Sequence, residues 1–266
     1  MNATTPIRDI WTPLVYLLAN AAGLLAILLP FLAPTLAPSQ AQVSPLFLPV
    51  MVSFCFLALL LEAQTGATTA KTMALLGVLV AINAVLRFIE VAIPGPGGFS
   101  PVFFLIIVAG YVFGARFGFL MGALTLLVSA ITTGGIGPWL PGQMLTASWV
   151  GLSAGALGQL THRRGLGERA ETVILTVAGI VWGFVYGVIV NLWFWPYTVG
   201  TAMAGIESAW DLLARYAAYY VATSALWDLS RALGNAILLG AFGRPALRAL
   251  RRFHRRFTFT YRPNSQ

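Results

Sequence analysis

Long apolar runs recur along nearly the whole chain, separated by short polar or proline- and glycine-rich segments. The runs at 11–36 and 72–92 are each long enough to cross a bilayer, which takes about 20 apolar residues. Only 9% of the residues are charged, whereas soluble globular domains carry about 25%. The sequence therefore predicts an all-α fold, a polytopic bundle of membrane helices.

The apolar runs and their boundaries predict about eight membrane spans. Some boundaries are segments that cannot continue a helix, such as the proline- and glycine-rich residues 94–101. The predicted spans cover residues 11–36, 46–61, 72–92, 102–113, 117–132, 141–160, 172–193 and 212–242. We expect the last of these to be one long, continuous helix.

Basic residues are distributed unevenly between the predicted loops. With the C-terminal tail placed inside, the inside segments hold Arg8, Lys71, Arg116, Arg163, Arg164, Arg169 and seven arginines after position 243. The outside segments hold only Arg87 and Arg215. Because cytoplasmic loops are enriched in Lys and Arg, we expect a plasma-membrane protein with both termini in the cytoplasm. The basic tail accounts for much of the net charge of +8 and fits anionic lipid rather than nucleic acid.

The stretch from Gly134 to Gly155 combines a rigid, uncharged loop with a helix rich in small residues. Trp139 and Gln143 lie where the loop becomes the helix, and are candidates for ligand contacts. The helix carries Ala147, Ser148, Gly151, Ser153, Ala154 and Gly155. Small residues let neighbouring membrane helices approach closely. A ligand site near one membrane surface fits this pattern, and so does a plain outer turn backed by a packed helix.

Two opposite charges lie inside the last predicted span. Asp228 and Arg231 are three residues apart, so they share a helix face and can pair. Tyr220 and Trp227 fall on or near that face. The pair either locks this helix to a neighbour or lines a ligand cavity. A continuous helix would place Arg231 about 30 Å from its outer end, which favours the structural role.

Two further groups of polar and aromatic residues lie near the predicted outer surface. Asn83, Arg87 and Glu90 form a stripe on one helix face, where Arg87 either contacts a ligand or pairs with Glu90. Asn191 and Trp195 belong to an aromatic run at the end of the seventh predicted span. That run is explained either by an interfacial aromatic belt or by stacking against a bound ring.

The motifs of common enzymes are missing from the sequence. The single lysine, Lys71, is not part of a GxxxxGK[ST] motif, so the chain carries no P-loop for ATP hydrolysis. Neither GxSxG nor HExxH occurs. These observations predict a protein without catalytic residues and without a bound cofactor or metal.

Three segments resemble the substrate-binding S component of energy-coupling factor (ECF) vitamin transporters. They are residues 101–155, the run NLWFWPY at 191–197, and residues 219–250, in that order. Within the family the chain is most similar to the cobalamin-linked group. The resemblance implies a six-helix core that binds a vitamin near the outer surface. It also implies two kinds of partner, a membrane scaffold called the T component and two cytoplasmic ATPases.

The resemblance divides the chain into three parts. Residues 1–67 form a two-helix transmembrane extension, residues 68–243 the six-helix core, and residues 244–266 a basic cytoplasmic tail. Family members contact the T component through small residues on the first core helix. The matching positions here are Ala70, Ala74, Gly77 and Ala81, in the spacing that permits close helix approach.

Two other functions are compatible with the residues alone. An ion-coupled secondary transporter could use Asp228 as its coupling carboxylate. A membrane scaffold without a small ligand would need none of the candidate site residues. Uptake that depends on a partner ATPase supports the vitamin-capture function, whereas uptake driven by the proton gradient without nucleotide supports the ion-coupled carrier.

Overall fold

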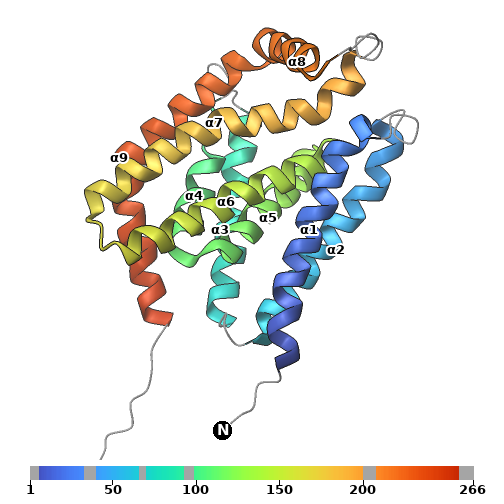
Figure 1. The fold of residues 1–266 in the computed structure, drawn as a ribbon. Helices are drawn as coiled ribbons and strands as arrows, with labels where there is room; N and C mark the ends of the chain where they lie inside the picture. Colours follow the sequence, from blue (N-terminus) through green and yellow to red (C-terminus); the bar gives the residue numbers. More distant parts are fainter. Residues whose placement is uncertain (1–5, 33–39, 66–69, 93–98, 200–207, 258–266) are drawn as a thin grey trace, which may run out of the picture.

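The computed structural model describes residues 6–32, 40–65, 70–92, 99–199 and 208–257, and these residues form nine α-helices and no strands. The helices are α1 (Pro6–Leu32), α2 (Gln40–Thr65), α3 (Ala70–Ala92), α4 (Val102–Phe113), α5 (Ala115–Thr133), α6 (Leu140–Arg163), α7 (Glu168–Val199), α8 (Ala209–Thr223) and α9 (Ala225–Phe257). The start of α1 and the end of α9 lie at the same end of the bundle, here called the terminal end (Figure 1). The opposite end is called the distal end. The predicted all-helical membrane fold is confirmed.

Five of the described helices are long and apolar enough to cross a membrane: α1, α2, α3, α5 and α7. α4 is equally apolar but has only 12 residues. α6 lacks the hydropathy of a lipid-facing helix because small and polar residues take the place of large apolar ones. More than half of its residues are buried inside the bundle. A helix surrounded by protein is selected for close packing rather than for contact with lipid.

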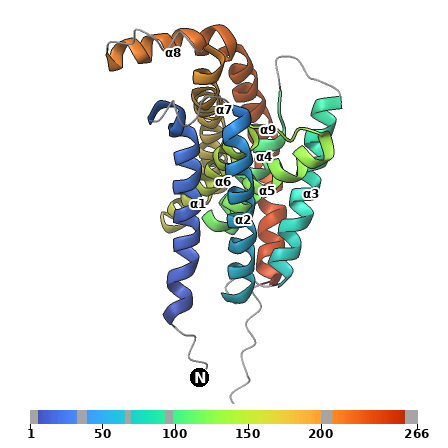
Figure 2. The ribbon, with the colours of Figure 1, turned by 90° about the vertical axis from the view of Figure 1, so that its right-hand side faces the viewer.

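The prediction of one continuous helix over 212–242 is wrong. The chain breaks at Ser224, which separates α8 from α9. α8 lies across the distal end, crosswise to α1, α2 and α3 (Figure 2). No proline or glycine marks the break, and Thr223 and Ser224 lie there. The Thr223 hydroxyl donates to the Tyr219 carbonyl and also lies 3.2 Å from the Ser224 hydroxyl. Such side-chain bonds compete with the helical backbone, and the hydrophobic pattern does not record them.

Because of the break, the predicted distance of about 30 Å between Arg231 and the outer end of its helix is also wrong. α9 begins at Ala225, so Arg231 lies only six residues from the start of its helix, or about 9 Å along the axis. Asp228 lies in the first turn of α9. The ion pair is therefore close to the distal end, directly behind the junction with α8.

α6 packs against α4 and α5 at backbone distance. A Cβ atom built at Gly151 would lie 2.0 Å from the carbonyl oxygen of Gly118 on α5. A Cβ at Gly110 on α4 would lie 2.4 Å from the carbonyl oxygen of Gly151. The small residues of the 134–155 stretch thus let three helices touch. Gly134, with a φ of 69°, ends α5 in a left-handed conformation that favours glycine.

Replacing Gly151 with alanine is expected to destabilise the protein by about 2–3 kcal/mol, since the added methyl group has only rigid backbone to displace. Gly77→Ala is the matched control, because nothing lies within 4 Å of a Cβ at Gly77. Thermal unfolding of the two variants in detergent measures the difference. Equal unfolding temperatures would contradict the close α5–α6 contact.

α1 and α2 cover α5 and α6 on one side of the bundle (Figure 1). Trp149 on α6 donates its indole N–H to Asn20 Oδ1 on α1. Glu62 on α2 is buried and accepts a hydrogen bond from Tyr16 at 3.3 Å, while Arg116 on α5 approaches it at 3.6 Å. Polar contacts of this kind fix the position of the two helices in a way that apolar packing in lipid alone does not.

Candidate functional site

Three polar side chains of α9 lie against three glycines of α7. In antiparallel order, Asp228, Arg231 and Asn235 face Gly187, Gly183 and Gly179. Arg231 Nη1 donates to the Gly183 carbonyl at 3.2 Å, and Asn235 Nδ2 donates to the Gly179 carbonyl at 2.9 Å. The missing side chains of the three glycines let α9 approach α7 closely, and two of the glycine carbonyls accept hydrogen bonds from α9. This arrangement joins α7 to α9 over about two helical turns.

The carboxylate of Asp228 fills the space above Gly187. A Cβ at Gly187 would lie 1.6 Å from Asp228 Oδ2, so only glycine fits there. Asp228 is 1% exposed, and Arg231 Nη1 pairs with its Oδ1. Tyr220, from α8, donates to Oδ2 at 2.7 Å. Both carboxylate oxygens are therefore occupied, as a buried charge requires.

Tyr220 connects α8 to the ion pair. Desolvation, reinforced by the hydrogen bond to Asp228, raises the pKa of the Tyr220 hydroxyl above its ordinary value. A tyrosine hydroxyl with its ordinary pKa of about 10 is already a donor at physiological pH, and the raised pKa extends this state to higher pH. Tyr216, one turn earlier on α8, donates to the carbonyl of Val188 on α7. The hydrogen bonds of Tyr216 and Tyr220 hold α8 against the distal ends of α7 and α9.

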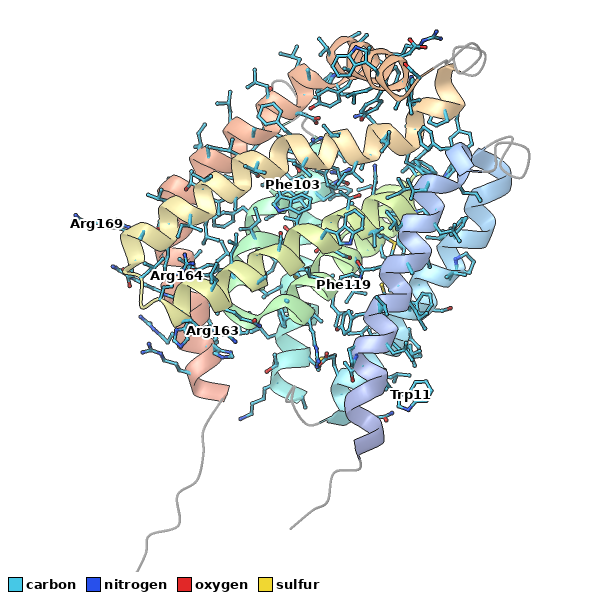
Figure 3. The ribbon with its side chains drawn as sticks, in the orientation of Figure 1. Trp11, Phe103, Phe119, Arg163, Arg164 and Arg169 are labelled. Atoms are coloured by element: carbon cyan, nitrogen blue, oxygen red, sulfur yellow. The ribbon has the colours of Figure 1, made fainter. Side chains whose placement is uncertain are left out.

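Arg231 is also enclosed by aromatic rings. Its guanidinium carbon lies 5.2 Å from the ring centroid of Tyr186 on α7 and 5.8 Å from that of Phe103 on α4. The two rings meet edge to face, with centroids 4.8 Å apart. Distances within about 6 Å are favourable for a cation over an aromatic face. Phe103 is marked in Figure 3, between the helices of the core.

The structure brings the Arg87 stripe near this ion pair. Arg87 Nη1 lies 3.4 Å from Glu90 Oε1, and Ser100 donates to Glu90 Oε2 at 2.8 Å. Glu90 is also near enough to Arg231 of α9 for the two charges to attract each other, although they form no ion pair within the described residues. The Arg87–Glu90 and Asp228–Arg231 pairs, about 140 residues apart in sequence, are together called the distal cluster. No hydrophobic pattern in the sequence indicates that the two pairs lie near each other.

Asn83 points into the protein rather than toward a surface. Its side chain is fully buried and donates to the carbonyl of Val102 and to the hydroxyl of Thr125. Its Oδ1 atom has no hydrogen-bond partner among the described residues. Asn83 therefore joins α3 to α4 and α5, one turn below Arg87. Its predicted contact with a ligand would need this buried position to open toward the cluster.

Trp139 and Gln143 lie at the turn between α5 and α6. Trp139 is 37% exposed, and its indole N–H donates to the Gly135 carbonyl at 3.2 Å. Its ring folds over Gly137, where a Cβ would lie 2.3 Å away. Gln143 is half-buried one turn into α6. Trp139 is accessible as the ligand hypothesis requires, but it also stabilises its own loop.

The aromatic run of α7 is mainly a packing centre. Trp195 is 1% exposed and packs against Phe31 of α1 and against Tyr216 and Tyr219 of α8. Asn191 is half-buried and donates to the Gly187 carbonyl of its own helix at 2.8 Å. These side chains connect helices within the part of the chain that the structure describes. Trp227 in the first turn of α9 is exposed, whereas the neighbouring Asp228 is buried.

The sequence does not indicate that Tyr186 and Phe103 enclose Arg231. One signal could have identified this face of α7. Gly179, Gly183 and Gly187 recur at intervals of four, the spacing that marks a contact face in membrane helices. The aromatic partners carried no such signal, because their positions fit an ordinary apolar core.

The four small residues predicted to contact a membrane partner lie on an open face of α3. Ala70, Ala74, Gly77 and Ala81 are all exposed. Large apolar side chains beside them, including Val78 and Ile82, are exposed as well. This face of α3 is therefore accessible to lipid or to another protein.

Comparison with protein-family models matches residues 71–240 to the family described as ECF transporter, substrate-specific component. The match covers more than half of the chain, from α3 into α9, and leaves α1 and α2 outside it. No curated protein and no solved structure matches the chain.

Proposed function

This chain belongs to the family of substrate-specific components of ECF transporters, and we propose that it captures a vitamin-type micronutrient, with cobalamin as the first candidate. Members of the family are transport subunits that work in a membrane with T and ATPase modules, and they are not enzymes. The observation that carries the proposal is the family match over the helices that build the distal cluster. The imported compound would be captured at the outer face and its import driven by ATP hydrolysis in the partners.

The distal end is the proposed location of the ligand. Three features support it: α8 covers this end, Arg87 and Glu90 bring charge to it, and the α5–α6 turn with Trp139 lies in the distal half (Figure 2). Lys71 lies in the first turn of α3, which starts at the terminal end (Figure 1), and Arg116 lies beside Glu62 near the end of α2. This is expected if the terminal end faces the cytoplasm. On this orientation both termini are cytoplasmic and the distal end opens outward.

The identity of the ligand is tested by mass spectrometry of the protein purified from cells supplied with cobalamin. A corrinoid that remains bound at a ratio near one per protein supports the proposal. Another vitamin retained at that ratio would keep the capture function and replace cobalamin as the substrate. Purification without any small molecule, together with no uptake when the partners are co-expressed, would contradict the capture function.

Trp139→Ala and Gln143→Ala are each expected to weaken ligand binding by roughly tenfold, the effect of removing one well-placed contact of about 1.4 kcal/mol. Trp11→Ala is the matched control, because Trp11 is an exposed tryptophan on α1 near the terminal end (Figure 3). Affinity is measured by titration of the purified variants. Wild-type affinity in both Trp139→Ala and Gln143→Ala, with unfolding temperatures also unchanged, would exclude this turn from the site.

A further inference from the structure

A groove of about 800 Å³ opens between the start of α7 and the middle of α9, far from the distal cluster. The two helices run antiparallel here, since Glu168 contacts Arg248 while Gly179 contacts Asn235. Residues early in α7 therefore face residues late in α9. This order sorts the lining of the groove into a basic half and an apolar half.

The basic half of the groove carries three arginines, Arg169, Arg244 and Arg248. Arg248 binds the Glu168 carboxylate with two nitrogens, at 2.6 and 3.0 Å to the same oxygen. Arg169 and Arg244 have no ion pair at 4.0 Å or less within the described part of the chain. Both are exposed, and Arg169 projects outward from the start of α7 (Figure 3). The three arginines and Glu168 together give the basic half of the groove a net charge of about +2.

The other half of the groove is apolar and open. Val173 and Val177 are 62% and 54% exposed. Gly240 on α9 has nothing within 4 Å of a built Cβ, so the space beside it is free. Thr172 and Thr176 bond their hydroxyls back to their own helix at 2.8 Å. The apolar half of the groove therefore offers a ligand mainly apolar contacts and few hydrogen bonds.

We propose that this groove binds one anionic phospholipid. The phosphate lies between Arg169 and Arg244, whose guanidinium forks match phosphate oxygens. One acyl chain runs along Val173 and Val177, over the gap at Gly240. Arg169 lies in the first turn of α7, next to the basic segment 162–171. The charge distribution assigns that segment to the cytoplasmic side, where anionic lipids are enriched.

Charge and shape together select this occupant. A soluble anion would use the arginines but would leave the apolar half empty. A neutral lipid would use the apolar half but would leave Arg169 and Arg244 without an ion pair among the described residues. An anionic lipid uses both halves at once. The site is independent of which compound the distal end captures.

The test measures lipid retention by native mass spectrometry of the full-length protein during stepwise removal of lipid in detergent. Dioleoyl phosphatidylglycerol is the probe and dioleoyl phosphatidylcholine the neutral comparison. The wild type is expected to retain one phosphatidylglycerol. The double variant Arg169→Gln with Arg244→Gln is expected to bind it roughly tenfold or more weakly, because each arginine at an anionic lipid surface contributes severalfold.

Two further variants separate a specific site from general surface charge. Arg163→Gln with Arg164→Gln removes the same charge from the end of α6, outside the groove, and is expected to retain the lipid (Figure 3). Gly240→Leu keeps every charge but fills the apolar half, and is expected to lose the lipid. All variants should unfold at the wild-type temperature once lipid has been removed.

Three results would overturn the proposal. Equal retention of phosphatidylcholine would show that charge does not select the occupant. Equal loss of phosphatidylglycerol in the Arg163 and Arg164 double variant would reduce the effect to diffuse surface charge. Displacement of the lipid by millimolar inorganic phosphate, with unchanged binding in Gly240→Leu, would identify a phosphate site rather than a lipid site.

Discussion

Asp228→Asn is expected to lower the stability of the protein by about 3–5 kcal/mol, the cost of leaving one charge of a buried pair uncompensated. Arg231 would then remain between the rings of Tyr186 and Phe103 without its counter-charge. Arg231→Leu is expected to cost a similar amount, because it leaves the buried Asp228 with only Tyr220 as a partner. Thermal unfolding in detergent measures both single variants.

The double variant decides what the pair does. Replacing both members of a buried pair with uncharged groups can be close to neutral, so Asp228→Asn with Arg231→Leu should regain most of the lost stability. We expect ligand binding and uptake to return with it, because the pair lies in a row of three α9 side chains that dock on α7 glycines. Full stability without ligand binding would instead make the pair part of the ligand cavity.

The Asp211–Arg215 pair on α8 is the matched control. It is also an Asp–Arg pair on one helix face, at 2.9 Å, but both side chains are about one-third exposed. Exposed pairs contribute about 1 kcal/mol or less, so Asp211→Asn should change stability little. A loss as large as that of Asp228→Asn would show that burial does not set the cost.

The same variants test the ion-coupled alternative. A coupling carboxylate must exchange its ion or proton during transport, whereas both oxygens of Asp228 are held by Arg231 and Tyr220. We therefore expect uptake by the reconstituted complex to need ATP and to keep its pH dependence in the double variant. Loss of that pH dependence, with uptake driven by a proton gradient alone, would favour the ion-coupled carrier.

Gly77→Leu combined with Ala81→Leu is expected to abolish assembly with the T component and the ATPases, to roughly a tenth of the wild-type yield or less. The physical reason is contact distance: small residues at intervals of four let two membrane helices touch, and leucine side chains hold them apart. Both positions are exposed, and Gly77 has no neighbour within 4 Å of a built Cβ, so the substitutions leave the isolated subunit folded. Co-purification with tagged partners measures assembly.

Ligand binding by the isolated double variant should equal that of the wild type, because α3 presents these residues away from the core. Ala214→Leu with Ala218→Leu introduces the same side chains at the same spacing on an exposed face of α8, and should assemble normally. Normal partner stoichiometry in the Gly77 and Ala81 variant would place the partner contact on another helix.

The sequence by itself determined the class of the protein and the positions of most helices. Apolar runs mark helices that are shielded from water by lipid or by protein, so the predicted span 102–113 and the helix α4 have the same bounds. The Asp228–Arg231 contact could also be predicted from the sequence, because residues three apart lie on the same face of a helix. The order of motifs predicted the family that the comparison supports. These features depend on neighbours along the chain, which a sequence displays.

Only the tertiary structure decided what each polar residue faces. The helix break at Ser224 places the ion pair near the distal end, and no proline or glycine in the sequence indicates this break. The glycines of α7 acquired their role from the α9 side chains opposite them, about 40 to 60 residues away. Trp195 became a packing residue because Tyr216 of α8 folds onto it. The physical reason is that hydrophobic periodicity records which face of a helix is buried, but not which helix covers that face.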